Sequence, residues 1–373
     1  MKKEHCCGCA ACTDACPTGA LRMAGDREGF RYPALRQDLC IHCGRCEAVC
    51  PLAHESAGNP APSWFGARAK TEAVRLGSSS GGLFPLLADY VLRRGGAVFG
   101  AAFDEQMDVV HREARTAEEL EGLKRTKYVQ SRPDGVYRRI QALLNEGVWV
   151  LFCGTPCQAH GLKLFLGRDD PRLILVDLVC YGVPSPGLWR DYLRVLERRR
   201  GGPVTAFSFR DKRNRDHGHT RAYTAGGREY AEPLNQDLFC GMYFTNLCIR
   251  PSCHVCPYGT ADRESDFTLG DFWGVERVRP EAGDGMGVSL AALRTEKARQ
   301  IWEEVREELD WFPCEKEDAR QPRLEGPTPP SRFRGAFMAL RRVLPGPALF
   351  FLFEKTRAAA GVCRWLVRRV LGR

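Results

Sequence analysis

The sequence predicts a chain of the α+β / α/β class, in which a small cysteine-rich domain precedes an α/β body with a partly parallel sheet. Two copies of one cysteine run within the first fifty residues indicate the small domain. Apolar runs at residues 148–153 and 173–179 indicate the body, because they flank a glycine turn and a helical pattern, as in a βαβ unit. At 373 residues, the chain is long enough for two or three units.

Both cysteine runs have the spacing C-x2-C-x2-C-x3-C-P. The first run comprises Cys6, Cys9, Cys12 and Cys16, and the second comprises Cys40, Cys43, Cys46 and Cys50. In bacterial two-cluster ferredoxins, the first three thiolates of such a run bind one 4Fe–4S cube and the fourth binds the other cube. We therefore assign Cys6, Cys9, Cys12 and Cys50 to cluster 1, and Cys40, Cys43, Cys46 and Cys16 to cluster 2.

A zinc site is the alternative, because a C-x2-C pair alone commonly binds zinc. Two consecutive runs of four cysteines, each closed by Cys-Pro, favour the iron–sulfur interpretation. Cys7 fits neither run and is interpreted as a non-ligand. Residues 1–55 are thus predicted to form a two-cluster 4Fe–4S ferredoxin domain.

The composition is typical of a globular protein without a membrane span. Hydrophobic residues make up 44% of the chain and charged residues 27%. No apolar segment precedes the first cysteines, and no run of 18 apolar residues occurs. Because cluster ligands must stay reduced thiolates, these features predict a cytoplasmic protein.

Residues 56–69 are rich in turn-forming residues and are interpreted as a linker, with a strand-like patch at residues 64–69. Residues 70–147 are predicted to begin the body. They hold a loop of Ser78, Ser79, Ser80, Gly81 and Gly82, a helix at residues 83–91, a strand at residues 97–103 and a helix at residues 136–144. The loop offers backbone N–H groups at a helix start, which suits an anion such as a nucleotide phosphate. The alternative is a simple turn of small residues, because the loop matches neither common phosphate-binding fingerprint.

Residues 148–312 are predicted to complete the body and contain the βαβ unit. Cys157 follows its first strand and Cys180 follows its second. Ligands of open α/β sheets bind at the carboxyl ends of strands, so both cysteines are predicted to lie at a site. We further expect helices at residues 188–199, 235–247 and 296–309, the last capped by Thr295, and strands at residues 204–210 and 287–294.

The body supplies four thiols with which a third cluster could form: Cys157, Cys180, and the C-x2-C pair Cys253 and Cys256. Four thiolates are the number that one 4Fe–4S cube needs. In the alternative, the two strand-end cysteines are small core residues, and the C-x2-C pair binds zinc with Cys248 and His254. The spacing alone leaves both interpretations open.

Several sequence blocks of the body occur in a distinctive order. They include Cys-Gly-Thr-Pro-Cys-Gln at residues 153–158, Asp-Leu-Val-Cys-Tyr-Gly-Val-Pro-Ser-Pro at 177–186, Arg-Pro-Ser-Cys-His-Val-Cys at 250–256 and Thr-Leu-Gly-Asp-Phe-Trp-Gly at 268–274. With residues 78–82 and 127–131, they resemble signature blocks of the family of coenzyme F420 hydrogenase/dehydrogenase beta subunits. The resemblance extends over about residues 70–309, and it implies an α/β body that binds FAD and an iron–sulfur cluster.

The resemblance also implies roles for individual residues. The body cysteines at 157, 180, 253 and 256 match the positions expected to bind the body cluster. The implied FAD contacts are Ser78, Ser79, Ser80, Gly81, Gly82, Lys127, Tyr128 and Thr155. The chain departs from the family at Tyr181, where members often have histidine, and at Thr126, where they often have serine. A phenol releases its proton less readily than an imidazolium, so the proton donor is an open question.

The resemblance implies an FAD- and iron–sulfur-dependent oxidoreductase, because a flavin is needed between one-electron clusters and a two-electron substrate. Electrons are expected to pass from the ferredoxin clusters through the body cluster to FAD, and then to an organic substrate or a deazaflavin. Tyr181, His160 and Asp271 are the candidate proton donors. The alternative is an electron-transfer subunit of a larger hydrogenase or dehydrogenase complex, without a substrate of its own. The expected electron donor is reduced ferredoxin or a catalytic subunit.

A Pro-rich linker at residues 313–331 leads to a basic tail at residues 332–373. The tail has nine Arg and one Lys against one Glu, so its net charge of +9 equals that of the whole chain. Apolar residues such as Val362 and Trp365 would lie opposite Arg364 on a helix, which fits a helix on the anionic inner face of a membrane. The alternatives are a packing helix and a partner-docking helix. Nucleic acid is not expected, because no recognised binding module accompanies the charge.

Overall fold

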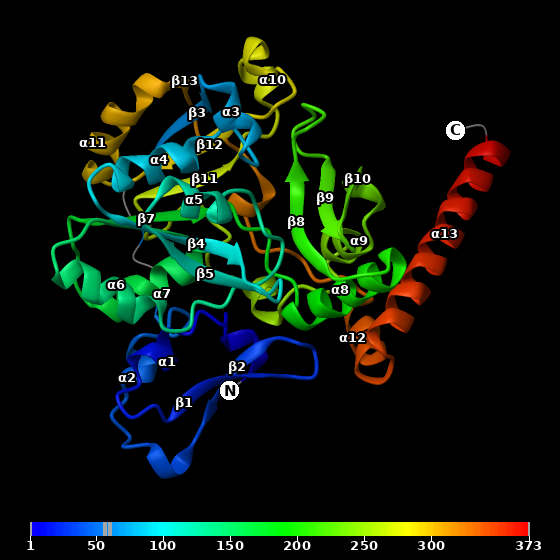
Figure 1. The fold of residues 1–373 in the computed structure, drawn as a ribbon, viewed down its shortest axis with the longest axis horizontal. Coiled ribbons are helices and arrows are strands. Elements are labelled where there is room, and N and C mark those ends of the chain that lie inside the picture. Colours follow the sequence, from blue (N-terminus) through cyan, green and yellow to red (C-terminus); the bar gives the residue numbers. More distant parts are fainter. Residues whose placement is uncertain (1, 55–57, 59–61, 372–373) are drawn as a thin grey trace.

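The computed structural model of the protein describes residues 2–54, 58 and 62–371, with side chains described as far as residue 358. Over these residues, the chain forms a small N-terminal domain, a large sheet covered by helices, a smaller sheet beside it, and a C-terminal helix along one flank (Figure 1). This arrangement confirms the predicted fold class, a mixed α/β body with a partly parallel sheet.

The backbone of the N-terminal domain repeats itself at the two cysteine runs. In each run, the residues two and four positions after the first cysteine have left-handed conformations; these are Gly8 and Ala10 in the first run, and His42 and Gly44 in the second. Such turns bend each loop back on itself, so that three cysteines can face one point. The elements of the domain are α1 (Ala11–Ala15), β1 (Leu21–Gly25), β2 (Arg31–Leu35) and α2 (Arg45–Ala48), with β1 and β2 forming a hairpin.

The large sheet has the strand order β13-β3-β12-β11-β7-β6-β4-β5 over the described residues. Its central strands run parallel; they are β11 (Phe267–Asp271), β7 (Leu173–Leu178), β6 (Val150–Gly154) and β4 (Ala97–Phe103). The outer strands pair antiparallel; they are β12 (Ser289–Leu293), β3 (Ser63–Ala69), β13 (Leu309–Cys314) and β5 (Val109–Ala114). Because the central strands share one direction, their carboxyl ends lie at the same edge of the sheet.

Helices cover both faces of the large sheet. On one face lie α4 (Leu83–Leu92) and α11 (Glu296–Val305), and on the other lie α6 (Val136–Asn145) and α7 (Pro156–Leu166). Burial on both sides explains why the central strands are nearly continuous apolar runs in the sequence. The predicted βαβ unit is β6, α7 and β7. The strand predicted at residues 97–103 and the helices predicted near residues 83–91 and 136–144 are also present.

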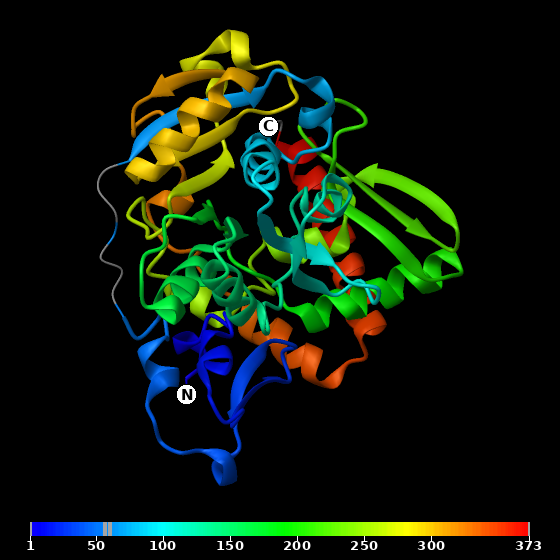
Figure 2. The same ribbon diagram turned by 60° about the vertical axis from the view of Figure 1, so that its left-hand side comes forward.

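The smaller sheet is antiparallel and stands to one side of the body (Figure 2). It consists of β8 (Val204–Asp211), β9 (Thr220–Ala225) and β10 (Arg228–Pro233), and it shares a core with α8 (Pro186–Arg200) and α9 (Leu238–Phe244). The sequence predicted β8 and α8 but neither β9 nor β10. The helix predicted at residues 235–247 is shorter, because the 3-10 helix η3 (Leu234–Gln236) precedes α9.

Two element boundaries differ from the sequence prediction. β3 confirms the strand-like patch predicted at residues 64–69, but it pairs with β12 and β13 in the large sheet and is not part of a linker. The helix expected to reach residue 309 ends at Val305, and Leu309 begins β13. In both places, partners distant in the sequence decide the conformation. The remaining elements are α3 (Glu72–Leu76), α5 (Ala117–Leu123), α10 (Val275–Val278), η1 (Lys3–His5), η2 (Gln37–Leu39), η4 (Pro251–Val255), η5 (Pro280–Ala282), η6 (Arg306–Glu308) and η7 (Pro322–Leu324).

The basic tail forms two helices, α12 (Arg334–Val343) and α13 (Gly346–Leu371). The start of α13 packs on α8, where Phe350 lies against Tyr192. The tail residues Val362, Trp365 and Arg364 lie outside the residues whose side chains are described, so the membrane interpretation stays a prediction. No helix among the described residues is both long and apolar enough to cross a membrane.

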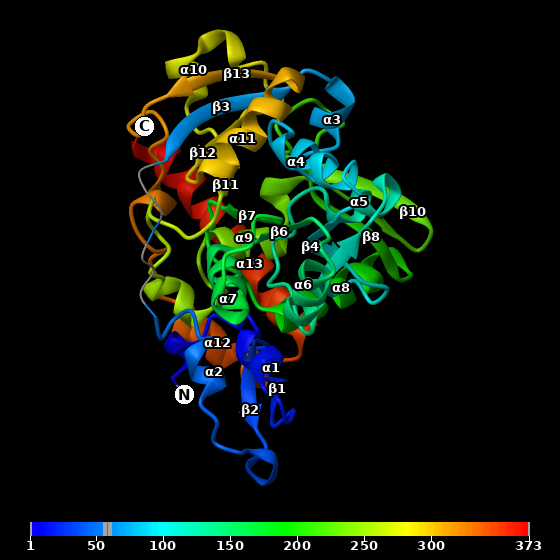
Figure 3. The ribbon, with the colours of Figure 1, turned by 90° about the vertical axis from the view of Figure 1, so that its left-hand side faces the viewer.

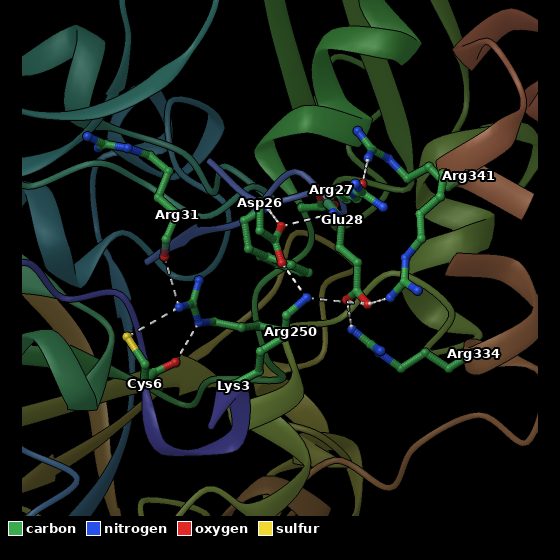
Figure 4. Close-up of polar contacts among 12 residues, drawn as sticks. Lys3, Cys6, Asp26, Arg27, Glu28, Arg31, Arg250, Arg334 and Arg341 are labelled. Carbon is green, nitrogen blue, oxygen red and sulfur yellow. Dashed lines mark hydrogen bonds and ion pairs between the residues drawn. The ribbon is translucent and has the colours of Figure 1, made fainter. Parts of the chain in front are cut away.

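Arginines of α12 hold the hairpin of the N-terminal domain (Figure 4). Glu28, in the hairpin turn, is 5% exposed, and its carboxylate accepts hydrogen bonds of 2.9 Å from Arg334 and from Arg342. The backbone of the turn is also bound, because the Ser185 hydroxyl donates to the Glu28 carbonyl over 2.5 Å. Part of the basic tail therefore binds the N-terminal domain of its own chain.

Replacing Glu28 with glutamine is expected to loosen the hairpin by about 2 kcal/mol, a typical value for hydrogen bonds to a charged group. Burial alone would raise the pKa of Glu28, but the hydrogen bonds from Arg334 and Arg342 lower it. The contribution of these hydrogen bonds to the stability of the hairpin is therefore present at neutral pH, and it is lost as the pH falls through the lowered pKa of Glu28.

The measurement is amide hydrogen exchange at residues 21–35, which should become roughly thirtyfold faster in E28Q at neutral pH. The control is E47Q, which changes an exposed carboxylate of the same domain and should leave the exchange unaltered. Equal exchange in E28Q and the unaltered chain would contradict this role of Glu28.

Candidate functional site

The carboxyl ends of the central strands form one edge of the candidate site. β6 ends at Gly154, and α7 begins two residues later. Thr155 caps this helix together with Gln158, and its hydroxyl lies 3.2 Å from the sulfur of Cys157. Cys180 follows the end of β7 in the same way. Both cysteines therefore lie at the edge where the sequence placed them.

A cavity of about 580 Å³ opens at this edge. All of the predicted FAD contacts except Gly81 line it. The four predicted body-cluster thiols also line it, as do Tyr181 and Asp271, whereas His160 does not. The volume is within the usual range for a cofactor or substrate pocket. One cavity thus collects residues from six sequence blocks that lie far apart along the chain.

The body thiols influence one another across this cavity. Burial raises the pKa of Cys180 to about 12, with further contributions from Cys157 and Cys256. Burial and Cys157 likewise raise the pKa of Cys256 to about 11, and the pKa of Cys253 is raised by burial, Cys180 and Cys157. Four close thiols in a dry site resist ionisation unless a cationic group binds them, which is the chemistry of a cluster ligand set.

The structure does not bring Cys248, the partner that a zinc site would need, to the cavity. Cys248 is fully buried in the core around α8 and α9. The ring of His254 faces the carbonyl of Thr328 at 2.8 Å. Among the described residues, no group of three or more His, Cys, Asp or Glu side chains is arranged to hold a metal ion. This finding includes the four body thiols, so the third cluster stays a prediction.

The N-terminal domain lies directly against α7 (Figure 3). A methyl group added at Gly161 would lie 3.1 Å from the sulfur of Cys9, so glycine permits this approach. Cys7 lines the body cavity and lies within hydrogen-bonding reach of two other thiols, those of Cys157 and Cys9. Its hydrogen bond with Cys157 lowers its pKa, but contact with Cys9 and burial raise that pKa overall. Cys7 therefore lies between a predicted ligand of cluster 1 and a predicted ligand of the body cluster.

The predicted ligands within the N-terminal domain are also close to one another. Burial raises the pKa of Cys12 to about 12, with contributions from Cys6, Cys50 and Cys46. Burial would also raise the pKa of Cys16, but backbone N–H groups such as that of Leu21 lower it to about 7. Hydrogen bonds from backbone N–H groups are what a cluster sulfur receives. The individual ligand assignments stay predictions.

The small-residue loop is held rigidly at the cavity wall. The hydroxyl of Ser79 accepts a hydrogen bond of 2.8 Å from the backbone N–H of Thr126. Ser80 is bound through its hydroxyl to the Val288 carbonyl and through its own carbonyl to the Lys212 ammonium. α4 begins directly after Gly82 without a side-chain cap. The start of this helix is thus kept available to an anion.

Aromatic rings form one wall of the cavity. Tyr128 lies 5.3 Å from Tyr243 and 5.6 Å from Phe244, measured between ring centroids. Tyr181 packs on the same two rings. Beside this wall, burial lowers the pKa of Lys127 to about 7. Aromatic walls suit planar ligands, which stack on them.

The candidate proton donors differ in their surroundings. The Tyr181 hydroxyl donates to Asn246 over 2.8 Å. Burial would raise the pKa of Asp271, but His217 and Arg210 lower it strongly, and the Arg210 ion pair measures 2.6 Å. His160 lies outside the cavity wall, and its ring contacts the Tyr258 hydroxyl at 2.6 Å. Tyr258 itself donates to the Pro51 carbonyl, so the His160 ring nitrogen is the donor in that pair.

Polar atoms without partners also occur in the cavity wall. Among the described residues, Nε and Nη1 of Arg323, Nδ1 of His111 and Oγ of Ser252 are buried without a hydrogen-bond partner. Burial lowers the pKa of His111 to about 4, so this ring is neutral. The sequence prediction missed these groups, because each becomes part of the site only through folding. Buried polar groups without a partner are rare in proteins, which distinguishes these three residues of the cavity wall.

Comparisons with known proteins agree with this geometry. Residues 148–314 match the family described as the C terminus of the coenzyme F420 hydrogenase/dehydrogenase beta subunit, and residues 5–53 match the family described as "4Fe-4S dicluster domain". The chain is 23% identical over 326 residues to the F subunit of F(420)H(2) dehydrogenase from Methanosarcina mazei, which covers 83% of this chain and 85% of the relative.

Two further similarities concern a ferredoxin and a solved structure. Over 51 residues, the chain is 39% identical to an uncharacterized ferredoxin of Methanocaldococcus jannaschii, which covers 14% of this chain and 65% of the ferredoxin. A chain in a structure of the F420-reducing NiFe hydrogenase complex from Methanosarcina barkeri aligns with a TM-score of 0.46 and 18% identity, covering 81% of this chain and 94% of the other.

Proposed function

Residues 148–314 belong to the C-terminal family of coenzyme F420 hydrogenase/dehydrogenase beta subunits and residues 5–53 to the 4Fe-4S dicluster domain family, and we propose that the chain is an iron–sulfur flavoprotein oxidoreductase. In this proposal, it transfers electrons from the N-terminal clusters through a body cluster to FAD, and on to an organic substrate or a deazaflavin. The two families by themselves make it an oxidoreductase-related iron–sulfur protein.

The observation that supports the proposal most directly is the cavity at the carboxyl ends of the central strands, beside the N-terminal domain. Its wall combines four body thiols, a rigid loop at a helix start and an aromatic surface. A cluster needs the four thiols, and the loop at the helix start suits an anionic cofactor such as FAD. The aromatic surface suits a planar ring. Cys7 and Gly161 bring this cavity against the predicted ligands of cluster 1.

When bound, the clusters supply one-electron steps and FAD supplies the exchange between one and two electrons. The residues of the chain would position these groups and exclude water. Tyr128 and Tyr181 would hold a planar ring by stacking. His217 and Arg210 keep Asp271 ionised, so its carboxylate does not donate a proton at neutral pH. Lys127 can hold or release a proton at Nζ near pH 7.

The test is the cofactor content of the full chain after anaerobic purification and reconstitution. Three cubes and one flavin predict about twelve irons and one FAD per chain. About eight irons without flavin would contradict the proposal and would leave only the ferredoxin domain. Replacing Lys127 or Tyr128 should weaken FAD binding without lowering the iron content.

A second candidate function is that of an electron-transfer subunit without a substrate of its own. It is favoured by the relative from Methanosarcina mazei, whose name makes it a dehydrogenase subunit. The N-terminal domain also offers a contact surface, because Cys43 is exposed and Ile41 beside it is 62% exposed. Stable co-purification with a catalytic subunit, together with no turnover of the isolated chain, would favour this function.

The name of the same relative also favours a deazaflavin as the substrate. Reduced and oxidised coenzyme F420 should then change the absorbance of the bound flavin under anaerobic conditions. A protein that exchanges electrons with reduced ferredoxin but not with the deazaflavin would exclude this substrate.

A further inference from the structure

Arg250 connects the body to the N-terminal domain from a position next to a body-cluster thiol. It immediately precedes η4, and its carbonyl accepts a hydrogen bond of 3.0 Å from the backbone N–H of Cys253. Its own N–H donates to the Val183 carbonyl over 3.0 Å. The backbone of Arg250 therefore belongs to the body, and the residue is fully buried.

The side chain of Arg250 reaches the first cysteine of the N-terminal domain (Figure 4). Its Nε donates to the Cys6 carbonyl over 2.7 Å, and its Nη2 lies 3.5 Å from the Cys6 sulfur. The same Nη2 donates to the Arg31 carbonyl, and Nη1 donates to the side-chain oxygen of Gln130, each over 3.0 Å. The guanidinium also lies over the ring of Tyr32, 4.2 Å from its centroid.

Every partner shown for this guanidinium among the described residues is a neutral oxygen, an aromatic ring or a cysteine sulfur. A fully buried cation is costly without a counter-charge. Arg263, an equally buried arginine of the body, illustrates the usual arrangement, because Asp177 pairs with it at 3.0 Å. The predicted counter-charge of Arg250 is different: it is a 4Fe–4S cube whose four thiolates make it a net anion.

We propose that Arg250 is the counter-charge of cluster 1 and raises its reduction potential above that of cluster 2. Reduction adds one negative charge to the cube, and a cation hydrogen-bonded to a ligand sulfur stabilises the reduced form more than the oxidised form. Within the part of the chain that the structure describes, no contact of Arg250 reaches the predicted ligands of cluster 2. This difference in reduction potential between the two clusters would direct electrons from the exposed cluster 2 inward to cluster 1.

This inference rests on the proposed iron–sulfur function but not on FAD or on any substrate. The test is therefore a redox titration of the full reconstituted chain, followed by electron paramagnetic resonance. The C12A variant identifies the titration wave of cluster 1 as the wave that it removes. The potential of that wave is then compared in the unaltered chain, in R250Q and in R250K.

In R250Q, the cluster 1 wave should shift to a more negative potential while the cluster 2 wave stays in place. R250K keeps the charge and should recover most of the shift. The matched control is R294Q, because Arg294 is 1% exposed and donates to the Thr268 hydroxyl and the Ala261 carbonyl; this variant should leave both waves unchanged. An unchanged cluster 1 wave in R250Q, at full iron content, would overturn the proposal.

If R250Q fails to retain cluster 1, Q130E provides the measurement instead. A carboxylate at this position would pair with Arg250 and cancel its charge, so the cluster 1 wave should again shift to a more negative potential. An unchanged wave in Q130E would overturn the proposal. A chain that binds clusters 1 and 2 but no FAD would contradict the flavoprotein function without affecting this result.

Discussion

Replacing Cys253 with alanine is expected to lower the iron content of the reconstituted chain from about twelve to about eight atoms. Cys253 lies in the cavity with Cys157, Cys180 and Cys256, and burial and these three thiols raise its pKa. The clusters of the N-terminal domain use other thiols and should be retained. Iron analysis and the visible absorption of the protein measure the loss.

The control for this experiment is Cys240→Ala. Cys240 is 1% exposed and lies in the core around α8 and α9, outside the cavity wall. The C240A variant should keep about twelve irons. Its stability should fall somewhat, because the substitution removes a small buried side chain from the core. If C253A keeps the iron content of the unaltered chain, the third cluster does not use this thiol set.

Replacing Cys12 or Cys43 with alanine is expected to reduce ferredoxin-driven reduction of the bound flavin to background. Each variant removes one predicted ligand of an N-terminal cluster, and the cavity contains neither residue. FAD binding should therefore be retained, and a small chemical reductant should still reduce the flavin directly. Stopped-flow absorbance at the flavin band separates the two routes.

The control is Cys314→Ala, which changes a cysteine of β13 at the far side of the large sheet. Ferredoxin-driven reduction should continue in this variant. Unimpaired reduction by ferredoxin in both C12A and C43A would mean that electrons enter the body without the N-terminal clusters.

The sequence predicted the parts of the fold that local pattern determines. The βαβ unit follows from apolar runs around a glycine turn, and α4 follows from apolar residues at helical spacing. β9, β10 and β13 were missed, because their identity depends on pairing. β3 was predicted as a strand-like patch but was assigned to a linker. β3 is a short segment within a turn-rich stretch, and it is a strand because β12 and β13 lie on either side of it.

The candidate site was predictable where its chemistry follows from spacing. The cysteine runs predicted the N-terminal ligands, and the family resemblance predicted the loop and the body thiols. Arg250 and Glu28 were not predictable, because their partners lie 244 and 306 positions away in the chain, in Cys6 and Arg334. Cys7 was interpreted as a non-ligand because it fits neither cysteine run. Its position between Cys9 and Cys157 results from folding and could not be predicted from the spacing.

The position of β3 between β12 and β13 has a consequence for synthesis of the chain. β3 leaves the ribosome early, but its two partners follow only after residues 289 and 309. Contacts across so many residues form slowly, so the nascent body should keep an unpaired strand edge until its last strand emerges. The hairpin of the N-terminal domain has no such delay, because its strands β1 and β2 are close together in the sequence. We therefore expect its clusters to be inserted before the body closes, and we expect a chain truncated before β13 to aggregate.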